Sequence, residues 1–209
     1  MKSKLLLPLL LVFVAVATMS YDRPKGWVRG GNSCGLYSYD MGNVVGAGKN
    51  GKSCATIKAL GCSNTHRKHC REIGHGDLMQ NFEAGKFRGQ RVRLTGWMRS
   101  EDAGTGGIWM QVHGSSYCHN YCSAAPCNNM DNVDGDNSLL EGTKPWTKLN
   151  LVVDVPEGAS SISYGARLYG GGQIWFENMK IEVVSRGVRT TGLPLGYNWV
   201  PTNMKFQRK

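Results

Sequence analysis

The chain has 209 residues, with 25 Lys and Arg against 15 Asp and Glu, and a formal net charge of +10 at pH 7. This length suits one domain with a full hydrophobic core, at the usual ~100–200 residues per domain. No segment approaches the ~20 consecutive apolar residues that a membrane helix needs, so the composition argues against a membrane span.

The N-terminus has the pattern of a secretory signal. Lys2 and Lys4 precede an apolar run from Leu5 to Ala17, and small residues follow that run. Cleavage after Ala17 or after Ser20 fits the small residues expected at such a site. We therefore expect an exported, extracellular protein.

Seven cysteines follow the signal, and an oxidising compartment favours disulfides over metal-bound thiolates. Three bridges and one leftover thiol are the simplest count. Pairing within a first group of four and a second group of three leaves the odd cysteine in the second group, where it is either buried or links two chains. The disulfide candidates are Cys34, Cys54, Cys62, Cys70, Cys118, Cys122 and Cys127.

The basic charge favours acidic partners for an exported protein. Sulfated or carboxylated glycans, anionic bacterial envelopes, mineral and nucleic acid would all be attracted in the same unspecific way. Ordinary solvated positions would give the same excess, and five of the positive charges near the two ends come from Lys2, Lys4, Lys205, Arg208 and Lys209. The expected partner is an extracellular glycan or another anionic polymer, and charge alone does not predict nucleic-acid binding.

Short alternating segments separated by turns follow one another along the chain. In residues 90–100, Val92, Leu94 and Met98 alternate with polar or aromatic residues, and this period of two predicts a strand with one buried face. In residues 173–184 the alternation slips near Asn178, as at a β-bulge. Strands are predicted at 37–40, 53–59, 78–82, 90–100, 107–114, 146–155, 161–169 and 173–184.

Helical periodicity is absent, and Gly-rich turns recur at short intervals. These features predict an all-β fold, namely a two-layer antiparallel β-sandwich or jelly roll with disulfide-stabilised loops. The predicted organisation is a signal peptide at 1–20, a single β-sandwich domain at 21–188 and a basic C-terminal tail at 189–209.

Several of these segments also resemble a known family. The matching motifs are Leu78-Met79-Gln80 with Phe82, the runs Phe87 to Arg93 and Trp109 to Gly114, Gly142-Thr143 with Trp146, Val153 to Pro156, and Gly172 to Asn178. In this order they resemble a bacterial jelly-roll domain of the galactose-binding-like type, found alone, sometimes exported, or attached to DNA-binding regulators. The resemblance implies that fold over roughly residues 74–184. It does not select one function, because the fold hosts sugar binding, phospholipid binding and structural support.

The chain departs from the family pattern at three places. His113 stands where the family usually has an acidic residue, and Gln111 stands where it has Arg. A Cys-rich insertion from Ser115 to Cys127 precedes Asn129-Met130, which resembles the family's Asp-Asn-Met. The departures indicate an exported relative with a remodelled loop, and they carry over no ligand role at those positions.

Outward-facing positions of the predicted strands supply aromatic, basic and amide side chains. Aromatic rings cover the apolar faces of sugar rings, while planar amide, guanidinium and carboxylate groups bind pairs of hydroxyls. We expect them to share one concave surface, although core packing is the alternative for any single Trp. The candidate carbohydrate-binding residues are Arg93, Trp97, Arg99, Trp109, Gln111, His113, Arg167, Tyr169, Trp175 and Glu177.

The sequence offers residues for two kinds of metal site. Asp131, Asp134 and Asp136 lie in a run of oxygen ligands around a glycine that would suit Ca²⁺, but the spacing is not that of an EF-hand, which favours a metal-free turn. Apart from this structural calcium no cofactor is expected. Zinc is disfavoured because neither cysteine and histidine group has the spacing of a finger. These groups are His66, His69 and Cys70, and His113, Cys118, His119, Cys122 and Cys127.

The sequence holds no motif of a nucleophilic or metal-dependent hydrolase. The carboxylates of Glu101, Asp102, Glu177 and Glu182 are available to a glycosidase, yet nothing places two of them at the ~5–10 Å that such catalysis requires. The predicted function is therefore secreted, non-catalytic binding of carbohydrate or another extracellular polymer. The alternatives are an extracellular-matrix component, in which the odd cysteine gives a disulfide-linked dimer, and a jelly-roll enzyme.

Overall fold

The computed structural model describes residues 21–32, 38–60, 74–114 and 139–191. In this part of the chain the only helices are two short 3-10 turns, and no helix is long and apolar enough to span a membrane. The elements are β1 (Val28–Asn32), β2 (Ser38–Val44), η1 (Lys49–Gly51), β3 (Cys54–Leu60), β4 (His75–Glu83), η3 (Gly85–Phe87), β5 (Arg91–Gly114), β6 (Leu139–Asp154), β7 (Ala159–Tyr169) and β8 (Gln173–Val184).

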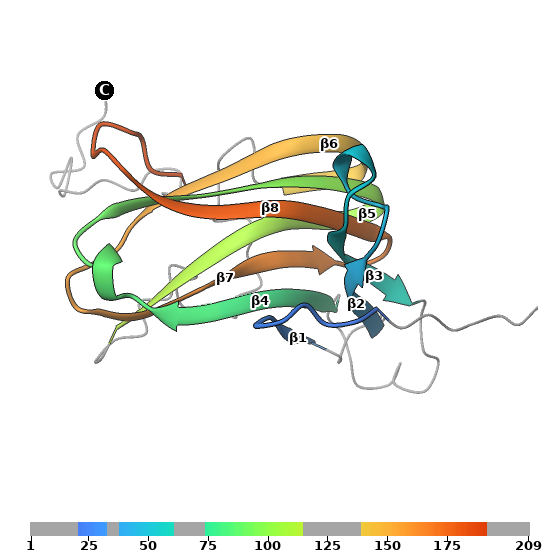
Figure 1. The fold of residues 1–209 in the computed structure, drawn as a ribbon, viewed down its shortest axis with the longest axis horizontal. Coiled ribbons are helices and arrows are strands. Elements are labelled where there is room, and N and C mark those ends of the chain that lie inside the picture. The colour runs from blue at the N-terminus through green and yellow to red at the C-terminus, as the bar shows by residue number, and fades with distance from the viewer. Residues whose placement is uncertain (1–20, 33–37, 61–73, 115–138, 192–209) are drawn as a thin grey trace, which may run out of the picture.

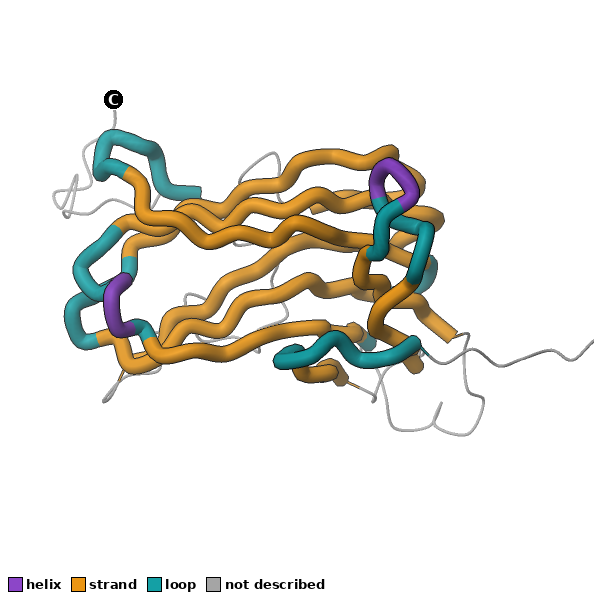
Figure 2. The backbone as a smooth tube through the Cα atoms, viewed as in Figure 1, coloured by secondary structure: helices purple, strands orange, loops and turns teal. Residues whose placement is uncertain are grey.

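The strands form two antiparallel layers. They are hydrogen-bonded in the order β1-β4-β7-β5-β8-β3-β2, with β6 on the free side of β5. One layer contains β4, β7 and the second half of β5, and the other contains β8, the first half of β5 and β6 (Figures 1 and 2). The predicted all-β sandwich is confirmed. Strand β1 is not among the predicted strands.

Strand β5 belongs to both layers. Its residues 91–101 pair with β8 and residues 105–114 pair with β7, with register shifts against β6 between Met98 and Gly106. The two strands predicted at 90–100 and 107–114 are therefore one hydrogen-bonded strand that turns a corner. Gly104 permits this corner, because a Cβ there would lie 2.5 Å from the carbonyl oxygen of Tyr169.

The core follows the predicted alternation. Val92, Leu94 and Met98 point between the layers and are fully buried, as is Ile174 on β8. Burying each large apolar side chain contributes about 1.5–3 kcal/mol. Val183 continues the alternation of Met179 and Ile181 along β8 but is 51% exposed. It lies beyond the part of β8 that β3 covers, since β3 pairs only with residues 173–176.

The predicted β-bulge in β8 is present. The pairing of β5 with β8 shifts register between Thr95 and Trp97, opposite Asn178. Asn178 has a φ of 53°, which lies in the left-handed region that asparagine tolerates better than most residues. The bulge allows Phe176 before it and Met179 after it to pack against the same core.

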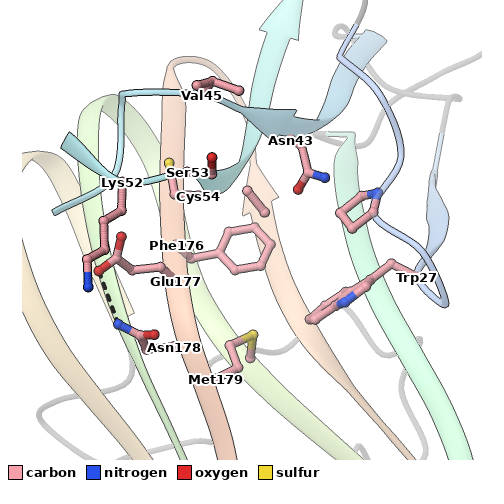
Figure 3. Close-up of a pocket in the computed structure, with 12 residues that line it drawn as sticks. Trp27, Asn43, Val45, Lys52, Ser53, Cys54, Phe176, Glu177, Asn178 and Met179 are labelled. Atoms are coloured by element: carbon pink, nitrogen blue, oxygen red, sulfur yellow. Dashed lines mark hydrogen bonds between the residues drawn. The ribbon is translucent and has the colours of Figure 1, made fainter.

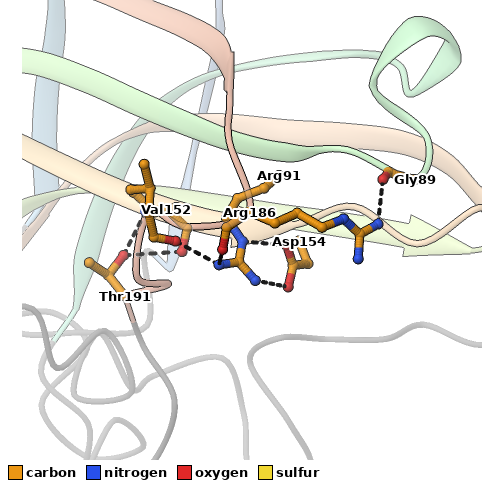
Figure 4. A network of polar contacts seen from close by, with 7 residues as sticks. Gly89, Arg91, Val152, Asp154, Arg186 and Thr191 are labelled. Atoms are coloured by element: carbon orange, nitrogen blue, oxygen red, sulfur yellow. Dashed lines mark hydrogen bonds and ion pairs between the residues drawn. The ribbon is translucent and has the colours of Figure 1, made fainter.

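The C-terminal segment covers the free edge of β6 (Figure 4). Val152 donates its backbone N–H to the Thr191 hydroxyl at 2.6 Å, and Thr191 donates its own N–H to the Val152 carbonyl at 2.9 Å. The guanidinium of Arg91 donates to both carboxylate oxygens of Asp154 and to the carbonyl of Val188. At Val152 this cover satisfies the backbone N–H and carbonyl that an open edge strand would leave unpaired.

Candidate functional site

The ten predicted binding residues lie on two different outer faces. The β5–β8 group consists of Arg93, Trp97, Arg99, Trp175 and Glu177, and the β5–β7 group consists of Trp109, Gln111, His113, Arg167 and Tyr169. Because β5 passes from one layer to the other, its outward side chains face opposite sides of the sandwich before and after the corner. The expectation of one shared concave surface is therefore wrong.

In the β5–β8 group the aromatic faces contact cations of the chain itself. The Arg99 guanidinium lies 4.0 Å from the centre of the Trp175 ring and 5.8 Å from that of Trp146. The Lys49 ammonium lies 3.3 Å from the centre of the Trp97 ring. Each contact stabilises by about 0.5–2 kcal/mol. Trp175 is only 8% exposed, so its ring has little surface left to offer a ligand.

The β5–β7 group surrounds a buried ion pair. Arg167 donates to both carboxylate oxygens of Asp77, and their side chains are 11% and 6% exposed. Burial alone would lower the pKa of Arg167, but the hydrogen bond and the charge of Asp77 outweigh it and raise that pKa. The Trp109 ring lies 5.1 Å from the guanidinium and is 9% exposed. The pair joins β4 to β7 and has the geometry of a structural link.

A pocket among the described residues lies where the N-terminal segment meets β2, β3 and β8 (Figure 3). We call it the edge pocket, and its volume is about 460 Å³. Its lining residues are Pro24, Trp27, Asn43, Val45, Lys52, Ser53, Cys54, Ala55, Phe176, Glu177, Asn178 and Met179.

Trp27 forms one wall of the edge pocket. Its ring centre lies 5.8 Å from that of Tyr164 in β7 and 6.0 Å from that of Phe176 in β8, so it contacts side chains from both layers. Such tilted and edge-on contacts are favourable for aromatic pairs. The wall is thus held in place by the core, as an aromatic binding surface requires.

Polar groups gather on the other side of the edge pocket. The Glu177 carboxylate accepts the backbone N–H of Lys49 at 2.9 Å and the side-chain amide of Asn178 at 3.2 Å. Burial, followed by the negative charge of Glu177, raises the pKa of the Cys54 thiol to about 11, so the thiol is protonated at neutral pH. The arrangement supplies hydrogen-bonding groups rather than a nucleophile.

The sequence predicted only part of this pocket. Glu177 was among the candidate residues, whereas Trp27, Asn43 and Asn178 were not. The phase slip at Asn178 was a usable signal, because a bulge redirects the side chains on either side of it. Trp27 stands in a loop-like Gly and Lys context, and no periodicity there reports that its ring reaches the core.

Cys54 differs from its predicted pairing. It is the one cysteine among the described residues, and it is free and buried. The odd thiol was expected in the second cysteine group instead. Cys34, Cys62, Cys70, Cys118, Cys122 and Cys127 lie outside the described residues.

The predicted metal sites fall almost wholly outside the described part. This applies to Asp131, Asp134 and Asp136, and to every zinc candidate except His113. Among the described residues no three His, Cys, Asp or Glu side chains cluster as metal ligands. Of the carboxylates weighed for catalysis, Glu182 receives hydrogen bonds from Lys180 and Arg93 that lower its pKa, the opposite of what a general acid needs.

No family model matches the chain. The uncharacterized HTH-type transcriptional regulator YbfP of Bacillus subtilis is 27% identical over 189 residues, covering 88% of this chain. The chain spans 57% of the length of that relative. The match agrees with the predicted resemblance to a domain that also occurs attached to DNA-binding regulators.

Solved structures with a similar fold include carbohydrate-binding modules. The xylan-binding domain of CBM 22 has a TM-score of 0.50 and 11% identity, covering 76% of this chain and 87% of its own. The CBM22-1–GH10 modules of Clostridium thermocellum xylanase 10B, complexed with xylohexaose, also give 0.50 and 11%, covering 79% and 27%. At this identity the likeness shows the jelly-roll β-sandwich alone.

Proposed function

We propose that the chain is a carbohydrate-binding β-sandwich that receives a sugar in the edge pocket. The observation that carries the proposal is a pocket of about 460 Å³ with an aromatic wall at Trp27 and polar groups at Asn43, Glu177 and Asn178. A sugar ring presents an apolar face and a rim of hydroxyls, which match a ring and planar polar groups respectively. The volume falls within the ~300–1,000 Å³ typical of small-ligand pockets.

The comparisons support the proposal at the level of the fold. A xylan-binding domain is built on the same jelly-roll β-sandwich, so this architecture is able to hold sugar-binding sites. At 11% identity no residue role carries over, and the site is argued from the side chains of this chain alone.

The proposed site is narrower than the set of ten predicted residues. Glu177 stays in it because its carboxylate lines the edge pocket. Trp175 and Arg99 are assigned to cation–π packing, and Arg167 is assigned to the link with Asp77. The alternative of a matrix component requires an odd cysteine that links two chains. Cys54 does not support it, because a side chain that is only 5% exposed does not reach a second chain.

Export and binding without catalysis belong to the same proposal. Residues 1–20 lie outside the described part, so the predicted signal peptide rests on the sequence. N-terminal sequencing of the native protein should find a start just after Ala17 or Ser20. Recovery of the uncleaved chain from inside cells would contradict export.

Affinity electrophoresis and calorimetry with neutral polysaccharides test the edge pocket. The intact chain should be retarded by at least one of xylan, galactan and glucan, and Asn43→Ala should weaken that binding about tenfold or more. Trp27→Ala should do the same, and its thermal unfolding must be followed because Trp27 also packs on the core. Trp146→Ala, on an outer face, is the matched control and should bind like the wild type.

The possible outcomes test the position of the sugar site and carbohydrate binding itself independently. Loss of binding in Trp146→Ala together with full binding by Asn43→Ala and by folded Trp27→Ala would move the site to the outer face. Failure of the wild-type chain to bind any polysaccharide would overturn carbohydrate binding itself.

A further inference from the structure

A second hollow lies on the outer face of three neighbouring strands, away from the edge pocket. Its volume is about 360 Å³. Thr95 on β5 stands between Asn150 on β6 and Lys180 on β8, and Arg93 on β5 stands beside Glu182 on β8. Lys148, opposite Trp97, completes the lining. We call this site the basic hollow.

The basic hollow carries excess positive charge. Its lining holds three cations, Arg93, Lys148 and Lys180, and one carboxylate, Glu182, which gives a net charge of +2. Glu182 is shared between Arg93 at 2.9 Å and Lys180 at 2.6 Å. Lys148 is exposed and has no ion-pair partner among the described residues. Lys180 is 67% exposed, so both ammonium groups are accessible to a ligand.

Neutral polar groups lie at the centre of the hollow. Thr95 and Asn150 are half-buried side by side on paired strands. Within the described residues, neither the Thr95 hydroxyl nor the Asn150 amide makes a hydrogen bond to the protein. Half-buried polar groups without a protein partner are available to a ligand that brings its own donors and acceptors.

We propose that the basic hollow binds the carboxylate or sulfate groups of an acidic polysaccharide, which names the ligand class of the proposed carbohydrate-binding function and rests on it. Lys148 and Lys180 meet the anionic group in charge-assisted hydrogen bonds. Thr95, Asn150 and the Glu182 carboxylate meet the neighbouring sugar hydroxyls.

The single carboxylate distinguishes a polysaccharide from other polyanions. Glu182 accepts hydrogen bonds from hydroxyls, whereas a phosphodiester backbone offers oxygens that it repels. The lining of the hollow also contains no aromatic side chain on which an unpaired base would stack. Acidic sugars combine both features that the hollow recognises, namely fixed negative charge and hydroxyl donors.

Strand β8 contributes residues to both the edge pocket and the basic hollow. Glu177 lines the edge pocket, while Lys180 and Glu182 line the basic hollow. Asn178, at the bulge between them, itself lines the edge pocket.

The test compares acidic and neutral polysaccharides on the intact chain at low and at ~0.15 M ionic strength. Polygalacturonate supplies carboxylates, dextran sulfate supplies sulfates and unmodified dextran supplies neither. The double variant Lys148→Gln with Lys180→Gln should lose about tenfold in affinity for at least one acidic polymer at low ionic strength. Lys25→Gln with Lys86→Gln makes the same charge change outside both sites and should lose much less.

Equal losses in the two double variants would overturn the proposal, because binding would then follow overall charge alone. If Lys148→Gln with Lys180→Gln still binds neutral polysaccharides, the proposed sugar site in the edge pocket is unaffected. The proposal for the edge pocket and the proposal for the basic hollow can therefore be contradicted separately. A wild-type chain that binds dextran as tightly as polygalacturonate and dextran sulfate would overturn the acidic preference.

Glu182→Gln gives a second, independent readout. It raises the net charge by one and keeps the side-chain size, so a purely electrostatic site would bind acidic polymers more tightly. Hydrogen bonding to hydroxyls predicts the reverse, a loss of about threefold or more for the acidic polysaccharide. Tighter binding of polygalacturonate by the variant, or preference of the wild type for single-stranded DNA, would overturn recognition of a sugar.

Discussion

Cys54 lies beneath the edge pocket in a protonated state at neutral pH. Burial and, to a smaller extent, the Glu177 carboxylate raise the pKa of its thiol, the Arg99 charge lowers it, and together they bring the pKa to about 11. Since the thiolate is the reactive form, a thiol with this pKa reacts slowly below pH 9.

We therefore predict that iodoacetamide leaves Cys54 unmodified in the native chain. Peptide mass spectrometry after labelling at pH 8 should find the peptide with Cys54 unlabelled in the folded protein and labelled in guanidinium chloride. Labelling of the native protein as fast as of the denatured one would contradict the burial of this side chain. Finding Cys54 in a disulfide would contradict its free state.

Asp154 makes stability depend on pH. The hydrogen bond from Arg91 lowers its pKa most, burial opposes the shift, and the charges of Arg91 and Arg186 add to it. A carboxyl with a lower pKa in the folded state than in the unfolded state stabilises the fold above its unfolded pKa of ~3.9. This contribution is lost as the pH falls through the folded pKa.

Asp154→Asn should consequently lower the free energy of unfolding by about 0.5–1 kcal/mol at pH 7, a value reduced for solvent screening. Urea titrations at several pH values should show the difference from the wild type shrinking below pH ~4. Glu141→Gln, at an exposed position, is the control and should show no such difference. A difference that stays constant into acid would mean that Asp154 acts through packing instead.

At the scale of elements, the corner of the sandwich depends on close backbone contacts. Gly172, in the turn from β7 to β8, has a φ of +85°. A Cβ at this position would lie 2.2 Å from the carbonyl oxygen of Asp102 in the β5 corner. The two crossing segments therefore touch through a residue that needs both the left-handed conformation and the absence of a side chain.

Gly172→Ala should lower the free energy of unfolding by about 2–4 kcal/mol. Gly158→Ala is the matched control, because its Cβ would meet nothing within 4 Å and its φ is not positive. The control should be unchanged or slightly more stable, by about 0.4–1 kcal/mol at most. Equal stability of Gly172→Ala and the wild type in urea would show that the corner relaxes freely.

The elements themselves were largely readable from the sequence. Strand β8 was predicted with its observed bounds, and the bulge at Asn178 was visible as a break in a period of two. The corner of β5 was not readable, because Gly104 and its glycine neighbours resemble an ordinary turn between two strands. Whether such a turn reverses within a layer or passes to the other layer depends on which strands pair with it, and pairing is not a local property.

At the scale of the whole molecule, that corner also explains the division of the predicted site. Alternation correctly put Trp109 and Trp175 on outward positions, yet both are buried by neighbouring side chains. Period two reports the direction of a side chain and not what covers it. Trp27 contacts Phe176 across about 150 residues of chain, a tertiary contact that no local pattern encodes.

The two layers should unfold together, because β5 is hydrogen-bonded into both of them. If one layer unfolded, half of β5 would lose its hydrogen-bonded partner strand. Core side chains of the other layer would also become exposed to water. Amide exchange of Leu78 in β4 and Ile57 in β3, both fully buried, should report the same free energy of opening across a denaturant series. A polysaccharide that binds the folded state should raise both values equally, through mass action. Exchange at one amide that stays slow after the other has become fast would show that each layer is a separate cooperative unit, and β5 would then not couple them.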